Sequence, residues 1–156
     1  MSIRTVKGNL ITLAKEGQFN VIVHGANCFN AMGGGIAAEV HRRLFNAHDI
    51  DFFFTKKGSK NKLGKISYAV EETLQHTPFV VINAYTQYHP GANFKLKALV
   101  KCLKKIRKQF GGMNLRFGFP LIGAGIGGGN WEDILNEIQW YLGDEDVMIV
   151  EFDGSK

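Results

Sequence analysis

The stretch Pro-Leu-Ile-Gly-Ala-Gly-Ile-Gly-Gly-Gly-Asn-Trp, residues 120–131, decides the fold more than any other part of the chain. An apolar run that predicts a strand leads into its glycines, and a segment with helical spacing follows them. A second cluster, residues 33–35, stands between the same two kinds of segment. Glycine allows positive φ angles and close approach of the backbone to a ligand, and N–H groups at the start of a helix attract anions. We therefore expect both loops to close on one ligand with several phosphates.

Length and composition predict one ordinary globular domain, residues 1–156. The chain has 156 residues, 45% of them hydrophobic, which is enough for a core without disulfide or metal staples. Cys28 and Cys102 form neither a disulfide framework nor a metal-binding spacing. The sequence shows neither the long apolar segment of a signal peptide nor a membrane span. We expect a monomeric, intracellular (cytoplasmic) protein with no metal and no cofactor.

The formal net charge of +5 comes mainly from one predicted helix, residues 93–110. A solvated helix face explains these lysines and arginines better than a nucleic-acid or polyanion patch, because no aromatic residues are interleaved for base stacking. We therefore do not expect nucleic acid as a partner. Long-range steering of an anionic ligand is a weaker role for the same charges.

Apolar patterning predicts strands that alternate with helices. The expected strands are residues 3–7, 19–24, 66–70, 79–84, 116–122 and 147–152. One expected helix begins near residues 34–35. Two others cover residues 93–110 and 131–142. Residues 52–54, three phenylalanines, fit either a helix or a core loop. This alternation favours an α/β sandwich with a largely parallel sheet, in which ligands bind beyond the carboxyl ends of the strands.

Two familiar phosphate-binding motifs are matched only formally. Residues 123–128 fit Gly-x-Gly-x-x-Gly, but they stand too near the end of the chain to open a dinucleotide-binding unit. Residues 58–65 resemble a P-loop with one intervening residue too many, and Ile66 takes the place of the metal-binding Ser or Thr. A pyrophosphate held by main-chain donors suits the glycine loops better.

Three polar residues are candidates for the chemistry. Asn27 follows a predicted strand, and its carboxamide fits a sugar hydroxyl, although it could also simply cap its loop. His24 could act as acid or base near neutral pH, or it could be a buried histidine that shares a backbone hydrogen bond. His89 is the second candidate for proton transfer, with a loop histidine beside a turn proline as its alternative.

The chain resembles a macro domain over essentially its whole length. The resemblance rests on residues 6–10 (Val-Lys-Gly-Asn-Leu), 21–28 (Val-Ile-Val-His-Gly-Ala-Asn-Cys), 32–37 (Met-Gly-Gly-Gly-Ile-Ala) and 120–131. It is nearest to the branch of yeast-type ADP-ribose-1''-phosphate phosphatases and related small phage and bacterial proteins. It implies a three-layer α/β/α sandwich around a mixed, mostly parallel, six-stranded sheet, with ADP-ribose as the ligand.

The resemblance also implies which residues contact the ligand. Asn9, with Leu10 beside it, stands where many macro domains carry an aspartate for the adenine amino group, and Phe152 matches a residue that packs near the adenosine. Asn27 matches the asparagine at the distal ribose. The loop around that ribose and its phosphate corresponds to Gly33, Gly34, Gly35, Ile36 and Ala37. The diphosphate loop corresponds to Ile122, Gly123, Ala124, Gly125, Ile126 and Gly127.

The implied activity is metal-independent hydrolysis of ADP-ribose-1''-phosphate to ADP-ribose and phosphate, with His24, Asn27 and His89 as candidate catalytic residues. A reader that holds ADP-ribose without turnover remains an alternative. So does an ADP-ribosyl hydrolase that acts on modified protein or nucleic acid. A related branch uses a lysine–aspartate pair, but this chain has Gly127 at the aspartate position, so we expect no covalent lysine mechanism.

Overall fold

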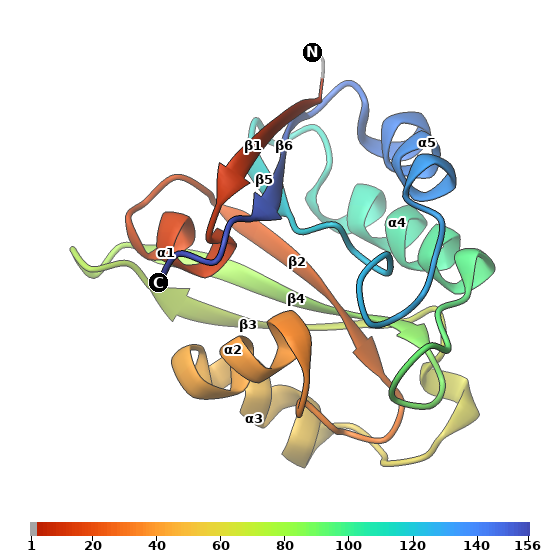
Figure 1. The fold of residues 1–156 in the computed structure, drawn as a ribbon. Helices are drawn as coiled ribbons and strands as arrows, with labels where there is room; N and C mark the ends of the chain where they lie inside the picture. Colours follow the sequence, from red (N-terminus) through yellow and green to blue (C-terminus); the bar gives the residue numbers. More distant parts are fainter. Residues whose placement is uncertain (1–2) are drawn as a thin grey trace.

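Six strands form one mixed sheet in the order β1-β6-β5-β2-β4-β3 (Figure 1). The structure is a computed structural model that describes residues 3–156. The strands are β1 Arg4–Gly8, β2 Val21–Asn27, β3 Ile66–Glu72, β4 Pro78–Gln87, β5 Arg116–Phe119 and β6 Asp146–Phe152. The edge strand β3 runs antiparallel to β4, and all other neighbours pair in parallel. The expected mixed, mostly parallel, six-stranded sheet is confirmed.

Helices cover both faces of this sheet (Figure 1). They are α1 Leu10–Lys15, α2 Gly35–Arg43, α3 Phe45–Phe54, α4 Leu96–Phe110 and α5 Trp131–Leu142, with a short 3-10 turn, η1, at Lys60–Lys62. Alternate residues of β2 point to opposite faces. Val21 and Val23 pack under α4 and α5, whereas Ile22 packs under α1, α2 and α3. The result is the expected three-layer α/β/α sandwich.

Element boundaries differ from the sequence expectation where short-range chemistry decides them. Helix α1 was not expected; it begins after Asn9, whose Oδ1 accepts a hydrogen bond from the N–H of Thr12 at 3.1 Å. Strand β5 ends at Phe119 instead of residue 122, since Pro120 has no N–H for the ladder. Residues 52–54 belong to a helix and are 50–77% exposed, so they are not a core loop.

The carboxyl ends of five parallel strands meet at one edge of the sheet. Helix α2 begins at this edge, and the loop between β5 and α5 crosses it (Figure 1). This arrangement follows from β2 lying between β5 and β4, and it brings both glycine clusters to the same edge. None of the helices among residues 3–156 combines the length and apolar character that crossing a membrane requires.

Candidate functional site

A cleft of about 770 Å³ runs along the carboxyl edge of the sheet. Its volume lies within the range typical of small-molecule and cofactor sites. Residues 33–37, the first glycine loop, and residues 122–127, the second glycine loop, both line it. Asn9, Leu10, Asn27 and Phe152 line it as well. The structure therefore brings to one cleft every residue that the resemblance implies for ligand binding.

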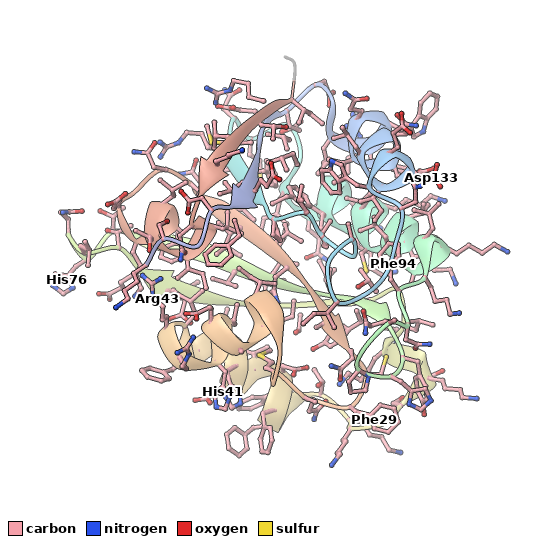
Figure 2. All side chains as sticks on the ribbon, viewed as in Figure 1. Phe29, His41, Arg43, His76, Phe94 and Asp133 are labelled. Atoms are coloured by element: carbon pink, nitrogen blue, oxygen red, sulfur yellow. The ribbon has the colours of Figure 1, made fainter. Side chains whose placement is uncertain are left out.

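The two glycine loops also approach each other across the cleft. Cδ1 of Ile126 lies 3.2 Å from the point where a Cβ would stand on Gly34, and equally close to that point on Gly35. Gly35 and Gly123 have φ angles of 57° and 76°, in the left-handed region that favours glycine. Phe94, labelled in Figure 2, supports the second loop from behind, and its N–H donates to the carbonyl of Gly127 at 3.2 Å.

Main-chain N–H groups are the anion-binding feature of the cleft. Gly34 caps α2 without a side-chain hydrogen bond. Within residues 3–156, the N–H groups of residues 35–37 and 125–127 donate to no protein acceptor. A helix start and a run of successive free N–H groups both favour negative charge. The described residues that line the cleft include no lysine or arginine; the ionisable ones are Glu39 and Glu151.

Asn9 and Phe152 mark one end of the cleft. The Asn9 side chain caps α1, and its Nδ2 donates to the carbonyl of Ser155 at 2.9 Å. Both polar atoms of this amide are therefore engaged within the protein. Phe152, the last residue of β6, is 67% exposed, so its ring is free to pack against a flat ligand group.

Asn27 marks the other end, where β2 stops beside β4. Its Oδ1 accepts hydrogen bonds from the N–H groups of Phe29 at 2.9 Å and Ala31 at 3.4 Å, and its Nδ2 donates to the carbonyl of Ala31 at 2.7 Å. The capping role raised as an alternative is therefore present. Asn27 lines the cleft at the same time, so the two roles do not exclude each other.

Comparison with known proteins assigns the family. The sequence pattern of the family described as Macro domain matches residues 23–138. An uncharacterized 17.5 kDa protein in the tk-vs intergenic region of Enterobacteria phage T4 is 35% identical over 157 residues, which is 98% of each chain.

The chain belongs to the Macro domain family. Among solved structures, the macrodomain of Mycobacterium tuberculosis DarG is similar, with 26% identity, 98% of each chain covered and a TM-score of 0.69. Thermosipho africanus DarTG, solved in complex with ADP-ribose, shares the fold at 18% identity and a TM-score of 0.78. That match covers all of this chain and 43% of DarTG.

The structure places neither histidine candidate of this macro domain in the lining of the cleft. His24 is 1% exposed and its ring Nε2 pairs with Asn83 Oδ1. Burial lowers the pKa of His24 and keeps its imidazole neutral in the core. Because β2 points this side chain toward α3, it has no path to a ligand in the cleft. The proposed catalytic contact of His24 is therefore wrong.

His89 lies outside the cleft, although its neighbour Pro90 lines it. The His89 ring stacks on Phe29, with centroids 5.1 Å apart and planes 12° apart, and it meets the edge of Tyr88 at 4.7 Å. The ring is thus held against the outer side of the rim. The expectation that it reaches the reacting atoms is not met by this arrangement.

Sequence reasoning missed the contribution of β4 to the macro domain cleft. Thr86 and Gln87, the last residues of that strand, line it together with Pro90 and Gly91 just beyond. Gln87 Nε2 donates to the carbonyls of His89 and Gly91, at 2.8 and 2.7 Å, and so fixes the turn. No spacing in the sequence marks these residues. They could be found only by knowing that β4 lies beside β2.

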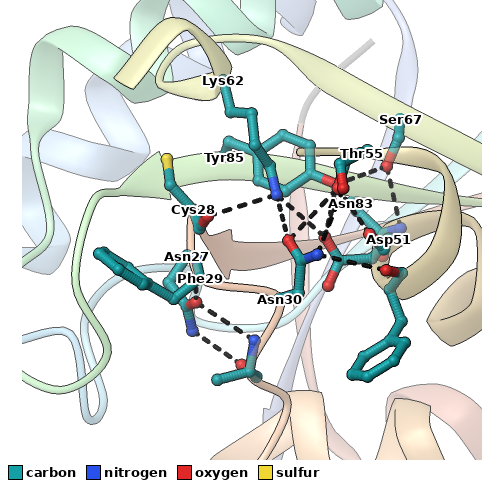
Figure 3. Close-up of polar contacts among 12 residues, drawn as sticks. Asn27, Cys28, Phe29, Asn30, Asp51, Thr55, Lys62, Ser67, Asn83 and Tyr85 are labelled. Atoms are coloured by element: carbon teal, nitrogen blue, oxygen red, sulfur yellow. Dashed lines mark hydrogen bonds and ion pairs between the residues drawn. The ribbon is translucent and has the colours of Figure 1, made fainter. Parts of the chain in front are cut away.

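A buried polar network lies behind the Asn27 end of the cleft (Figure 3). Lys62 Nζ donates to the carbonyl of Cys28 at 3.4 Å and to Asn30 Oδ1, and it lies 3.7 Å from Asp51 Oδ1. The Tyr85 hydroxyl donates to the same Asp51 oxygen at 2.7 Å. Burial raises the pKa of the Cys28 thiol, so Cys28 stays protonated and is no nucleophile.

Proposed function

We propose that this protein binds ADP-ribose in the cleft and hydrolyses ADP-ribose-1''-phosphate to ADP-ribose and phosphate. One observation carries the proposal: free N–H groups from both glycine loops face a single cleft whose lining has no cationic side chain among the described residues. Such a cradle suits a diphosphate held by the main chain, and it needs no metal ion for that purpose. The ADP-ribose complex of the structurally similar DarTG supports the choice of ligand.

The two ends of the cleft give the ligand a direction. The adenine lies at the Asn9 and Phe152 end, where an exposed ring can pack against it. The diphosphate lies between the glycine loops. The distal ribose and its 1''-phosphate lie at Asn27, beside Gln87.

Glu39 is our candidate for activating water, because the histidines do not line the cleft. It lies one turn of α2 after Gly35, and residues four apart share a helix face. Glu39 lines the same cleft as residues 35–37, and its carboxylate pairs with the Arg42 guanidinium. In the proposed reaction, Glu39 accepts a proton from water as the water oxygen attacks phosphorus. The bond between phosphorus and the 1'' oxygen breaks, and that oxygen leaves with a proton taken from solvent.

Two measurements test this function. Titration calorimetry with ADP-ribose tests binding, and phosphate release from ADP-ribose-1''-phosphate in the presence of a chelator tests the reaction. Glu39→Gln should lower the turnover number by about 100-fold or more, as expected for losing a general base, with little change in affinity for ADP-ribose.

Glu151→Gln is the matched control, since Glu151 is the other carboxylate of the lining but belongs to the Asn9 end. It should leave turnover within about twofold of the unmodified protein. Equal losses in both variants would refute the role of Glu39. Tight binding of ADP-ribose with no phosphate release would remove the phosphatase proposal and leave a reader; the absence of histidines from the described lining favours that second candidate.

A further inference from the structure

The short loop of residues 28–31 separates the cleft from the buried polar network. Asn27, the residue just before it, and Ala31, its last residue, line the cleft. Cys28 and Asn30, within it, turn inward and are 0% and 9% exposed. Asn30 has a φ angle of 57°, in the left-handed region, so the loop is held in a conformation that few residues adopt freely. The position of Asn27 therefore depends on what holds the inner side of this loop.

Lys62 holds that inner side. It is 7% exposed, and its ammonium donates to the Cys28 carbonyl and to Asn30 Oδ1 (Figure 3). Asn30 Nδ2 in turn donates to the carbonyls of Phe52 and Thr55, each at 3.3 Å. These bonds connect the loop to the end of α3 and to η1.

Asp51 compensates the charge of Lys62. Its carboxylate is 1% exposed, lies 3.7 Å from the ammonium and accepts the Tyr85 hydroxyl. The ammonium also lies 4.7 Å from the centroid of the Tyr85 ring, within cation–π range. A buried ion pair contributes little net stability, because desolvation offsets its attraction, whereas it defines geometry well. We therefore explain the buried Lys62–Asp51 pair by its effect on the geometry of the cleft and not by a gain in stability.

We propose that Lys62 and Asp51 are positioning residues, which fix the 28–31 loop so that Asn27 is set to bind the distal ribose. This inference rests on the proposed function, in which ADP-ribose lies with that ribose at Asn27. Neither side chain touches the ligand. Their effect is confined to the part of the ligand beyond the diphosphate, and ADP lacks the distal ribose while keeping the rest.

The comparison of ADP-ribose with ADP tests this inference. Lys62→Met removes the ammonium and keeps an unbranched apolar stem. Measured by calorimetry, the Lys62→Met variant should bind ADP-ribose about tenfold more weakly, because the charge-assisted hydrogen bonds from Lys62 to the loop are lost. ADP binding should change by less than about twofold. A merely structural role would weaken both ligands alike.

Two further variants complete the design. Lys60→Met is the matched control: Lys60 is in the same η1 turn but exposed, and both affinities should stay unchanged. Lys62→Met leaves Asp51 buried without its partner, which can unfold the domain. The double variant Asp51→Asn, Lys62→Met removes both charges and keeps an acceptor for Tyr85. It should show the same selective loss of ADP-ribose affinity.

Parallel loss for both ligands in the folded variants, or no loss for either, would overturn the positioning role. Failure of the unmodified protein to bind ADP-ribose would instead overturn the proposed function itself. Binding of ADP-ribose by the unmodified protein, followed by selective loss in the double variant, supports both.

Discussion

Individual glycines among residues 123–129 serve two different purposes. A Cβ on Gly129 would stand 2.6 Å from the Phe94 ring, so this glycine is required by packing. Gly125, in contrast, has nothing within 4 Å of its Cβ position and faces the open cleft. The sequence shows a single run of glycines and does not distinguish those required by packing from those that face the cleft. The distinction depends on contact with Phe94, which precedes α4 in the chain.

Gly125→Glu should therefore block the ligand without harming the fold. Its side chain enters free space and places a carboxylate where the diphosphate binds. We expect the affinity for ADP-ribose to fall by about 100-fold or more, since like charges in a confined site repel strongly. The thermal midpoint should change by only a few degrees. Calorimetry and thermal unfolding measure the two quantities. Gly125→Ala is the control; a full loss of binding there would mean that backbone change, and not occupation of the cleft, is responsible.

The buried His24 makes the free energy of unfolding depend on pH. Its pKa is lowered from 6.5 in the folded protein, so the unfolded chain takes up the proton first as the pH falls. The free energy of unfolding should hence decrease below about pH 6.5, by at most about 1.4 kcal/mol per pH unit for this one group. Glu71 acts in the opposite direction, because burial raises its pKa.

The His24→Gln variant separates the contribution of His24 to the pH dependence from that of Glu71 and other titrating groups. Denaturant unfolding between pH 7.5 and 5 should show a smaller decrease for the variant than for the unmodified protein. Identical pH profiles would contradict a neutral, buried imidazole.

At the scale of elements, the contribution of α2 to the cleft was the easiest to predict from the sequence, and that of β4 was the hardest. Gly34 and Gly35 mark the start of a helix whose Val40 enters the core, as does its C-cap Leu44, so the position of α2 follows from local pattern. The lining contributed by β4 follows only from its place beside β2. His24 was misplaced for a related reason: period-two alternation puts it on the opposite face of β2 from its neighbours, and the sequence does not say which face meets the cleft.

The contact between the glycine loops predicts a kinetic effect. Ile126 lies over the cleft against Gly34 and Gly35, so Ile126→Ala should speed the release of ADP-ribose by about tenfold. It should have less effect on association. Stopped-flow measurement of both rate constants tests this. Met113→Ala is the control, because Met113 is equally exposed at 59% but lies in the turn after α4. An unchanged release rate in Ile126→Ala would show that the side chain does not retain the ligand.

For the whole molecule, strand order is the decisive fact. The sequence predicts strands, helices and glycine loops with a macro-domain pattern, and the resemblance supplies the sheet. Without this resemblance, no pattern in the sequence predicts that β2 lies between β5 and β4. That order brings loops about ninety residues apart to one edge and makes a single cleft of them. The side chains that would carry the chemistry are less predictable, because the face of each strand that meets the cleft depends on the strand's place in the sheet.

A crystal structure of the protein with ADP-ribose tests the central claim most directly. The diphosphate should accept hydrogen bonds from N–H groups of both residues 35–37 and residues 125–127, at about 2.7–3.2 Å. A diphosphate bound by one loop alone, or bound outside the cleft, would contradict the account.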